Sequence, residues 1–340
     1  MSTTYAGEID AEVRQLFDSV MSDWRARRPS PEVAVRPDRE LWDTLVELGL
    51  TDLSRAEDAD WWTSAELLRA AARHAAPLPL AEHGLLAGWL AKGAGLKTGE
   101  GMRTVALLDD AGRGSRVPWA SSVDRLVVAW RAGGRAWATE IDRSDASIEA
   151  GLDLAGQPRD TVTVDGTVRR AGREIDPALL DGVRLRGALV RAIQTTGAID
   201  EIVERTVMHV SERRQFGRPL ARFQAVQHLL ADAAAESTLA RAATDAAIAA
   251  ATRLDSEWGR STQLELRVAV ARSVVAVSAG RVVRHAHQLH GAIGTTLEHP
   301  LQEFTKPVLA WRSEFGTPRE WDERVIALAT RNGSVWSSLV

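Results

Sequence analysis

The stretch SERRQFGRPL occupies residues 211–220, and the run FQAVQHLLAD follows it at residues 223–232. Gly217 and Pro219 interrupt the helical period, because glycine is conformationally free and proline lacks an N–H group, so one helix ends here and another begins. Alanine-rich stretches of helix length lie on both sides of this interruption, at residues 190–210, 224–252 and 263–289. Such lengths predict a C-terminal helical bundle whose helices pack closely on alanine and glycine.

The first stretch carries groups that suit a phosphate ligand. Arg213 presents a planar fork of donors that matches a phosphate diester. Gln215 and Phe216 add an amide and an aromatic edge beside it. Because Gly217 to Pro219 end the helix, we expect the group at a helix terminus where backbone donors are free. The alternative is an arginine that only satisfies the carbonyls of a helix C-terminus.

A second motif, QLHGAIG, lies at residues 288–294, at the end of the last alanine-rich stretch. Gly291 and Gly294 would let the backbone approach a ligand closely, since neither carries a Cβ. The alternative is that these glycines only permit close helix packing. The motif therefore indicates a second candidate contact for the same ligand.

The rest of the chain predicts two further parts. Apolar residues recur at helical spacing from Leu16 to Trp24 and from Leu41 to Leu50, with further helices expected at 65–75 and from Leu85. Short β-type runs divided by glycine-rich and aspartate-rich turns follow at 105–108, 125–130, 136–139 and 161–164. The predicted fold class is α+β and mainly α. It has an N-terminal helical domain at 1–102, a small central antiparallel β domain at 103–180 and a C-terminal four-helix bundle at 181–340.

Composition narrows the class of protein. The net charge of -4 gives no basic field for nucleic acid or an anionic membrane. The absence of cysteine excludes disulfides and thiolate chemistry, and the eight histidines show no HExxH spacing, so we expect no metal site. The first ten residues contain two acids and no apolar core, and no apolar run approaches the ~20 residues that span a bilayer. We expect a cytoplasmic protein with neither a membrane nor a nucleic-acid partner.

The two motifs together resemble the acyl-CoA dehydrogenase family. Residues 213–232 follow that family's pattern R-x-Q-F-G-x-P-L followed by F-Q-x-V-Q-x-x-L-A-D, and residues 288–294 resemble its Q-x-x-G-G-x-G. Segments 41–50 and 73–79 also look familial, so the resemblance covers essentially the whole chain. In the family, residues at these positions cross a subunit interface and contact the ADP part of a neighbour's FAD. The resemblance thus implies a cofactor half-site made of Arg213, Gln215, Phe216, Gln288, His290, Gly291 and Gly294.

The chain departs from the family at the catalytic base. Family enzymes remove the α-proton of an acyl-CoA thioester with a glutamate that stands before a Gly-Thr pair. That position is Phe315 here, before Gly316-Thr317, and a phenyl ring cannot take a proton. The second base position known in the family falls near Gly187-Ala188, which also lacks a carboxylate. Glu314 adjoins the usual position and is the one candidate for a displaced base, with an exposed surface acid as its alternative.

The β domain departs as well. Family members hold the flavin ring with a hydroxyl residue and a backbone donor in a W-I-T-N-A run. The corresponding run here is residues 117–124, where Pro118 provides neither hydroxyl nor N–H. The other ring-side run is reduced to residues 108–112. The chain therefore keeps the contacts that would serve a neighbour's flavin and lacks those that would serve its own.

These half-kept sites resemble the short, base-less partner subunits of heteromeric acyl-CoA dehydrogenases in actinobacterial steroid and lipid breakdown. The resemblance implies an FAD-dependent, α,β-dehydrogenating complex acting on an acyl-CoA, with a glutamate-bearing homologue as partner in an α2β2 assembly. Two other functions stay open: a complete homo-oligomeric enzyme using Glu314, and a relic of the fold that binds an acyl-CoA or a protein without redox chemistry. The sequence does not identify the acyl chain.

Assembly has a second line of support in the last long helix. Residues 268–282 are apolar over more than one face, and three or four helices of one chain are not expected to cover them all. We therefore expect a dimer through the bundle, with a second copy or a homologue. Arg272, in the same helix, is expected to be a solvated charge or an inter-subunit partner.

Overall fold

The computed structural model describes residues 11–28, 35–52 and 60–331. The N-terminal part is helical, with α1 (Ala11–Arg27), α2 (Arg39–Glu47), α3 (Trp61–Arg73), the π-helix η1 (Ala81–Gly88) and α4 (Trp89–Gly93). Asp38 and Asp60 start α2 and α3 by accepting backbone N–H bonds from Leu41 and Thr63, as N-cap residues do. The apolar spacing at 16–24 and 41–50 thus forms the expected helices.

The central part contains two small sheets. Its strands are β1 (Arg103–Leu108), β2 (Arg113–Pro118), β3 (Arg125–Ala132), β4 (Arg135–Asp142), β5 (Ala146–Glu149), β6 (Arg159–Val164) and β7 (Arg173–Ile175), with the short helix α5 (Gly166–Arg170) before β7. The strand orders are β1-β3-β4-β7 and β2-β6-β5. The strand pairs are antiparallel except β1 with β3, which run parallel. The strand between β1 and β3 in the chain, β2, belongs to the second sheet. The chain therefore crosses over through that sheet and enters β3 in the same direction as β1, which makes the pair parallel.

Strand β3 shows how the sheet is buried on both faces. Its residues alternate between two apolar clusters, as the two-residue period of a strand requires. Val127 and Ala129 pack with Leu86 and Leu90 of the neighbouring helices. Leu126 and Val128 pack on the opposite side, in the cluster that holds Val162. The unbroken apolar run at 126–130 therefore reflects a central strand covered on both sides.

The C-terminal part is a bundle built around one long helix. Its helices are α6 (Ala178–Glu212), α7 (Gln224–Arg253), α8 (Thr262–His290), α9 (Gln302–Trp311) and α10 (Pro318–Arg331). Helix α6 also packs on α3, and Gly197 permits the close approach, because a Cβ there would lie 2.6 Å from the carbonyl oxygen of Arg69. The predicted fold class is confirmed: the chain is mainly helical, with a small β part between two helical parts.

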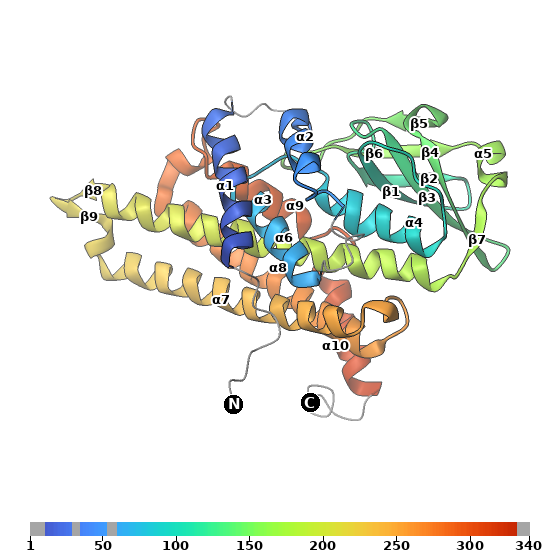
Figure 1. The fold of residues 1–340 in the computed structure, drawn as a ribbon. Coiled ribbons are helices and arrows are strands. Elements are labelled where there is room, and N and C mark those ends of the chain that lie inside the picture. The colour runs from blue at the N-terminus through green and yellow to red at the C-terminus, as the bar shows by residue number, and fades with distance from the viewer. Residues whose placement is uncertain (1–10, 29–34, 53–59, 332–340) are drawn as a thin grey trace.

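Helix α6 connects the two ends of the molecule. Its 35 residues span about 50 Å at 1.5 Å per residue. The sheets lie at the end where α6 begins, and the hairpin of β8 (Arg214–Gln215) and β9 (Arg218–Pro219) projects from the other end (Figure 1). No helix in the described residues is long and apolar enough to cross a membrane.

The single chain covers α8 better than its sequence suggests. Val268, Ala271, Val275 and Val282 are fully buried, because α6, α7 and α10 surround the helix. Val277 is the exposed member of the predicted apolar set, at 49%. The argument that this helix needs a partner to cover several faces is therefore wrong. A dimer stays a prediction that rests on other residues.

Candidate functional site

The first sequence motif forms the end of α6 and the hairpin beyond it. The helix ends at Glu212, and the Arg213 N–H donates to the carbonyl of His209 at 2.9 Å. The carbonyl of Arg213 then accepts from Leu220 at 2.8 Å, which closes the hairpin. The expectation of free backbone donors here is wrong, because a helix C-terminus leaves carbonyls without partners, not N–H groups. Arg213 and Gln215 offer exposed side-chain donors for an anion here.

Five of the seven predicted cofactor residues lie on the surface: Arg213, Gln215, Phe216, Gln288 and Gly291. Phe216 is 91% exposed and has a φ of 52°, a backbone region that phenylalanine rarely adopts. Within the described residues, no carboxylate lies in ion-pair contact with Arg213. An exposed phenyl ring beside an unpaired guanidinium is a surface suited to a ligand or partner.

The other two, His290 and Gly294, are buried beneath that surface. The imidazole of His290 stacks on that of His209 with ring centroids 4.3 Å apart, so the two sequence motifs meet where α6 and α8 end. Gly294 leaves room for this packing, because a Cβ there would lie 2.7 Å from the Cβ of His290. His290 and Gly294 therefore pack in the interior next to the exposed residues of the second motif.

At the other end of α6, the two base positions expected from the family lie in contact. A Cβ at Gly187 would lie 2.4 Å from Cδ1 of Phe315, so the phenyl ring sits directly against the glycine. Phe315 has a φ of 56° and precedes Gly316, whose φ is 126°. The sharp turn at 315–316 is held by Arg272, which donates to the carbonyls of Trp311, Arg312 and Glu314. The ring of Phe315 therefore fills the space beside Gly187, between the two positions that the sequence predicts for a base.

Arg272 itself differs from its prediction. It is only 1% exposed, so the expectation of a solvated or inter-subunit charge is wrong. Burial lowers the pKa of its guanidinium to about 10, which still leaves it protonated at neutral pH. Its Nη2 group satisfies carbonyls left by the end of α9, and this requirement explains why a cation is placed there.

Glu314 is buried between two arginines. Its carboxylate accepts from Nε of Arg159 and from Nε of Arg191, each at 2.6 Å. Burial would raise the pKa of Glu314, but the charges of Arg191 and Arg159 outweigh it and lower the pKa to about 2. At 9% exposure, the residue is not the surface acid that the sequence left open. It is an ionised carboxylate whose lone pairs are already engaged.

The ion pairs continue from Glu314 into a chain of buried charges. Arg191 also binds Glu82 of the π-helix η1 at 2.5 Å and the side chain of Gln194 at 2.6 Å. Arg159 also lies 3.4 Å from the carboxylate of Asp153. Burial opposes the charge of Arg191, yet Glu314 and Glu82 raise its pKa above its ordinary value. These residues therefore compensate one another within the chain.

Two cavities lie on opposite sides of these charges. One, of about 830 Å³, is lined by the end of β2, the start of α6 and residues 313–316. The other, of about 590 Å³, lies among α1, α3, residues 152–157 and α9. Glu314 lines the first cavity, whereas Glu82 and Arg191 line the second, and the two cavities share no lining residue. The Glu82–Arg191–Glu314 pairs thus form part of the wall between them.

Pro118 lines the larger cavity at the position where the family has a hydroxyl residue. The neighbouring Trp119 is buried, has a φ of 61°, and donates its N–H to the carbonyl of Pro158 at 3.2 Å. The N–H of Ser121 donates to Asp160 at 2.7 Å. The backbone donors of this run are therefore used within the β domain.

Comparisons with known proteins bear on the C-terminal domain and on the fold. Residues 185–321 match the family described as the C-terminal domain of acyl-CoA dehydrogenase. Residues 185–321 are therefore similar to this C-terminal domain, and the match covers less than half of the chain. A curated relative, acyl-CoA dehydrogenase IpdE2 of Mycobacterium tuberculosis, is 30% identical over 190 residues, which cover 54% of this chain and 53% of the relative. The chain thus spans about half the length of the curated relatives that it matches.

Solved acyl-CoA dehydrogenases share the fold over nearly the whole chain. The ChsE4–ChsE5 complex of Mycobacterium tuberculosis superposes with a TM-score of 0.80 at 18% identity, covering 95% of this chain and 98% of that one. A variant of the Tcur3481–Tcur3483 steroid ACAD gives a TM-score of 0.79 at 23% identity, with the same coverage. At these identities the likeness establishes the fold.

Sequence reasoning missed the buried ion pairs. Glu82, Arg159 and Arg191 lie far apart in the chain, and spacing does not indicate that they meet. One signal was present: Arg191 lies within the apolar run at 188–193, where a charge cannot easily reach water. A charge in such a run predicts a buried counter-charge from another element.

Proposed function

We propose that this chain is a subunit of an acyl-CoA dehydrogenase complex that contributes no catalytic base and completes the FAD site of a glutamate-bearing homologue. The observation that carries the proposal is the contact of Phe315 with Gly187. It fills both of the family's base positions with groups that cannot accept a proton. FAD, when bound, supplies the acceptor for the hydride that leaves the substrate.

Glu314 does not replace the missing base in this proposal. Removal of an α-proton needs a carboxylate whose pKa lies near the operating pH and whose lone pair faces the substrate. The pKa of Glu314 is about 2, and its carboxylate oxygens accept from two guanidiniums. The same pairs lie between the two cavities, whereas catalysis requires the flavin and the acyl group to meet.

The opposite end of the bundle fits the ADP part of FAD better. Arg213 and Gln215 are exposed donors, Phe216 is an exposed ring, and a Cβ at Gly291 would meet nothing within 4 Å. This surface lies at the far end of α6 from the cavity lined by Pro118 and Phe315 (Figure 1). About 28 helical residues separate Leu185 from Arg213, or about 40 Å, which is longer than an extended FAD molecule. The half-site therefore suits a flavin held by a neighbour.

The similar proteins support the choice of partner and substrate class. The ChsE4–ChsE5 structure is a complex of two proteins, and the Tcur3481–Tcur3483 structure is named a steroid ACAD. We therefore infer a homologous partner subunit and an acyl-CoA thioester of lipid or steroid origin as the substrate of the complex. The stoichiometry that we propose is α2β2, with the hairpins in the interface.

The test compares the chain alone with the chain co-expressed with homologous acyl-CoA dehydrogenases from its own genome. We expect colourless protein alone and a yellow complex with flavin absorption in the presence of the right partner, with light scattering reporting the assembly. Yellow protein from the chain alone would support the complete homo-oligomeric enzyme instead. A chain that stays colourless and unpartnered while binding acyl-CoA would support the non-redox function.

A further inference from the structure

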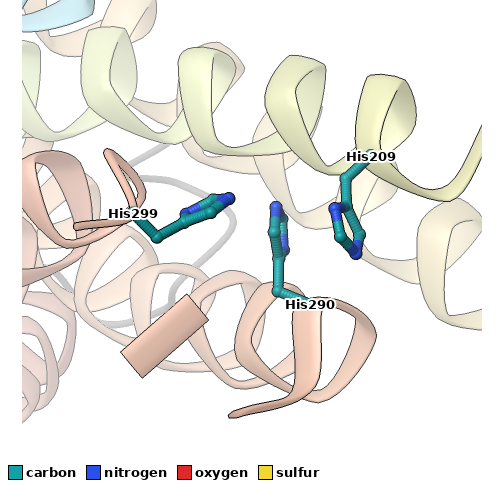
Figure 2. A group of neighbouring side chains, drawn as sticks. All are labelled: His209, His290 and His299. Atoms are coloured by element: carbon teal, nitrogen blue, oxygen red, sulfur yellow. The ribbon is translucent and has the colours of Figure 1, made fainter. Parts of the chain in front are cut away.

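Three histidines from separate segments meet beneath the hairpin. His209 lies in the last turn of α6, His290 ends α8, and His299 lies in the loop that precedes α9. One ring nitrogen of each lies within 4.8 Å of the other two. Figure 2 shows the three imidazoles side by side, with the ring of His290 between those of His299 and His209. His299 lies in the loop whose Leu297 lines the cavity of about 590 Å³, and the three histidines take no part in the ion pairs around Glu314.

His290 has a ring nitrogen without a partner. Its Nδ1 lies 2.8 Å from the carbonyl of Ala286 and must donate to it, because a carbonyl only accepts. The neutral ring then has a lone pair on Nε2, which is buried and has no hydrogen-bond partner among the described residues. His290 is only 6% exposed, so this atom loses its water on folding without compensation. A buried acceptor of this kind requires an explanation.

Ring packing alone does not supply that explanation. His209 stacks on His290 at 4.3 Å between centroids, and His299 meets His290 edge-on at 4.9 Å. These contacts bury the rings and still leave Nε2 of His290 unsatisfied. A backbone carbonyl bound to the far nitrogen is also the usual arrangement that orients a histidine metal ligand.

The charge state of the group suits a cation. Burial lowers the pKa of His290 to about 4 and also lowers the pKa of His209 and His299, so the rings are neutral near pH 7. The nearby Arg205 is paired with Glu201 at 2.7 Å, and Glu212 offsets part of the effect of Arg213 on His209, which reduces the repulsion of an added ion. Neutral imidazole nitrogens prefer Zn²⁺ and its late first-row neighbours over Mg²⁺ or Ca²⁺.

We propose that His209, His290 and His299 form a binding site for one Zn²⁺-class ion. Zn–N bonds of about 2.0–2.1 Å place the nitrogens of a tetrahedral site about 3.3 Å apart, so binding requires side-chain rotations that separate the stacked rings of His209 and His290 and turn their nitrogens to one point. The fourth position is left for water or an anionic oxygen. The ion would tie the ends of α6 and α8 to the loop before α9 and so fix the base of the hairpin. This site does not depend on the proposed function.

The test is a titration of the full chain, purified without a polyhistidine tag and stripped of metal, with Zn²⁺ and with Co²⁺. We expect one equivalent to bind, and Co²⁺ to give visible absorption of a four-coordinate nitrogen site. Changes to the residues that orient a metal's ligands weaken binding by about 10–100-fold. The loss of a ligand itself, in His299→Gln or in His209→Gln, should weaken binding by more than that. His209 and His299 are replaced instead of His290, because His290→Gln would also remove a buried ring at the end of α8 and so change the packing there.

The matched control is His285→Gln. His285 lies on the same helix, and its Nε2 is already 2.7 Å from Asp232. This variant should bind one equivalent as tightly as the parent chain. Absence of stoichiometric binding by the parent, or equal binding by all four proteins, would overturn the proposal. Neither outcome bears on the partner subunit, because the titration needs neither FAD nor an acyl-CoA.

Discussion

The two ends of α6 handle charge in opposite ways. At the sheet end, Glu82, Arg191, Glu314 and Arg159 are buried and bound to one another. At the hairpin end, Arg213 is exposed with no ion-pair partner in the described part of the chain. A charge that is buried must be paired inside its own chain, whereas one that serves a neighbour must stay open until the neighbour arrives. The contrast separates a closed structural region from an incomplete site.

The same contrast appears in the aromatic residues at each end. Phe315 packs its ring against Gly187 and so closes the position of the base. Phe216 projects its ring into solvent, although exposing so large an apolar group is unfavourable. Both have a positive φ, a strained backbone for phenylalanine. One strained turn thus closes a site and the other opens one, and each can be tested separately.

The largest expected effect concerns turnover. The isolated chain, supplied with FAD, an electron acceptor and a panel of acyl-CoA thioesters, should show no dehydrogenation above background. The reason is that general base catalysis contributes about 10²–10⁴-fold and neither base position has a carboxylate. The assay is reduction of the acceptor followed by absorbance. Turnover that disappears in Glu314→Gln protein that is still folded, as measured by circular dichroism, would instead establish Glu314 as the base.

The next effect is on stability at the closed end. Glu314→Gln should lower the free energy of unfolding by about 1.5–3 kcal/mol, because it removes the ionised acceptor of two buried hydrogen bonds, while Glu82 and Asp153 still pair with Arg191 and Arg159. Chemical denaturation of the parent and variant measures the loss. The control is Glu323→Gln, whose parent residue pairs with Arg319 on an exposed helix face, and which should change little.

The dependence of the free energy of unfolding on pH gives a second test of the same ion pairs. The folded-state pKa of Glu314 is about 2 against an ordinary value of 4.5, so its contribution is fully present above about pH 4.5 and is lost as the pH falls toward 2. The parent chain should therefore lose stability over that range more steeply than Glu314→Gln. Parallel curves for the two proteins would mean that the carboxylate gains nothing from its two arginines.

At the open end, Arg213→Ala should weaken FAD retention in the assembled complex without unfolding it. Loss of a charged hydrogen bond to phosphate costs about 1.5–3 kcal/mol, which corresponds to roughly 10–150-fold in the dissociation constant. Flavin content after dialysis gives the result, and Arg319→Ala, another exposed arginine, is the control. Equal flavin content in parent and Arg213→Ala would exclude a role for this guanidinium in holding the cofactor.

Sequence predicted the fold well because its signals are local. The helical period, the proline and glycine stops and the β-type runs lie within short windows, and the structure confirms the mainly helical fold class. The parallel pair of β1 and β3 was missed because it depends on β2 joining the other sheet, a long-range choice. The first motif predicted where one helix ends and the next begins, but not which of the candidate site residues are buried.

The site itself was only half predictable for the same reason. The approach of Gly187 to Phe315 joins residues 128 positions apart, and Arg159 meets Glu314 across 155 positions. The sequence left an exposed position open for Glu314, because no residue near it in the chain indicates that Arg159 and Arg191, from other elements, bind its carboxylate. His299 shows no metal spacing with His209, since the three rings meet only where α6 and α8 end together.

The smallest effect tests whether Phe315 truly closes the base position. Gly187→Ala should destabilise the chain by about 1–3 kcal/mol, because the new methyl group would lie within 2.4 Å of the phenyl ring and force it to move. In a Phe315→Ala background the same change should be neutral or stabilising, since alanine is the better helix former by about 1 kcal/mol. Gly280→Ala is the matched control in α8, where the nearest atom lies at 3.7 Å. A cost at Gly187 that persists without the ring would mean that the helix, not Phe315, requires glycine, and the closed base position would lose its main support.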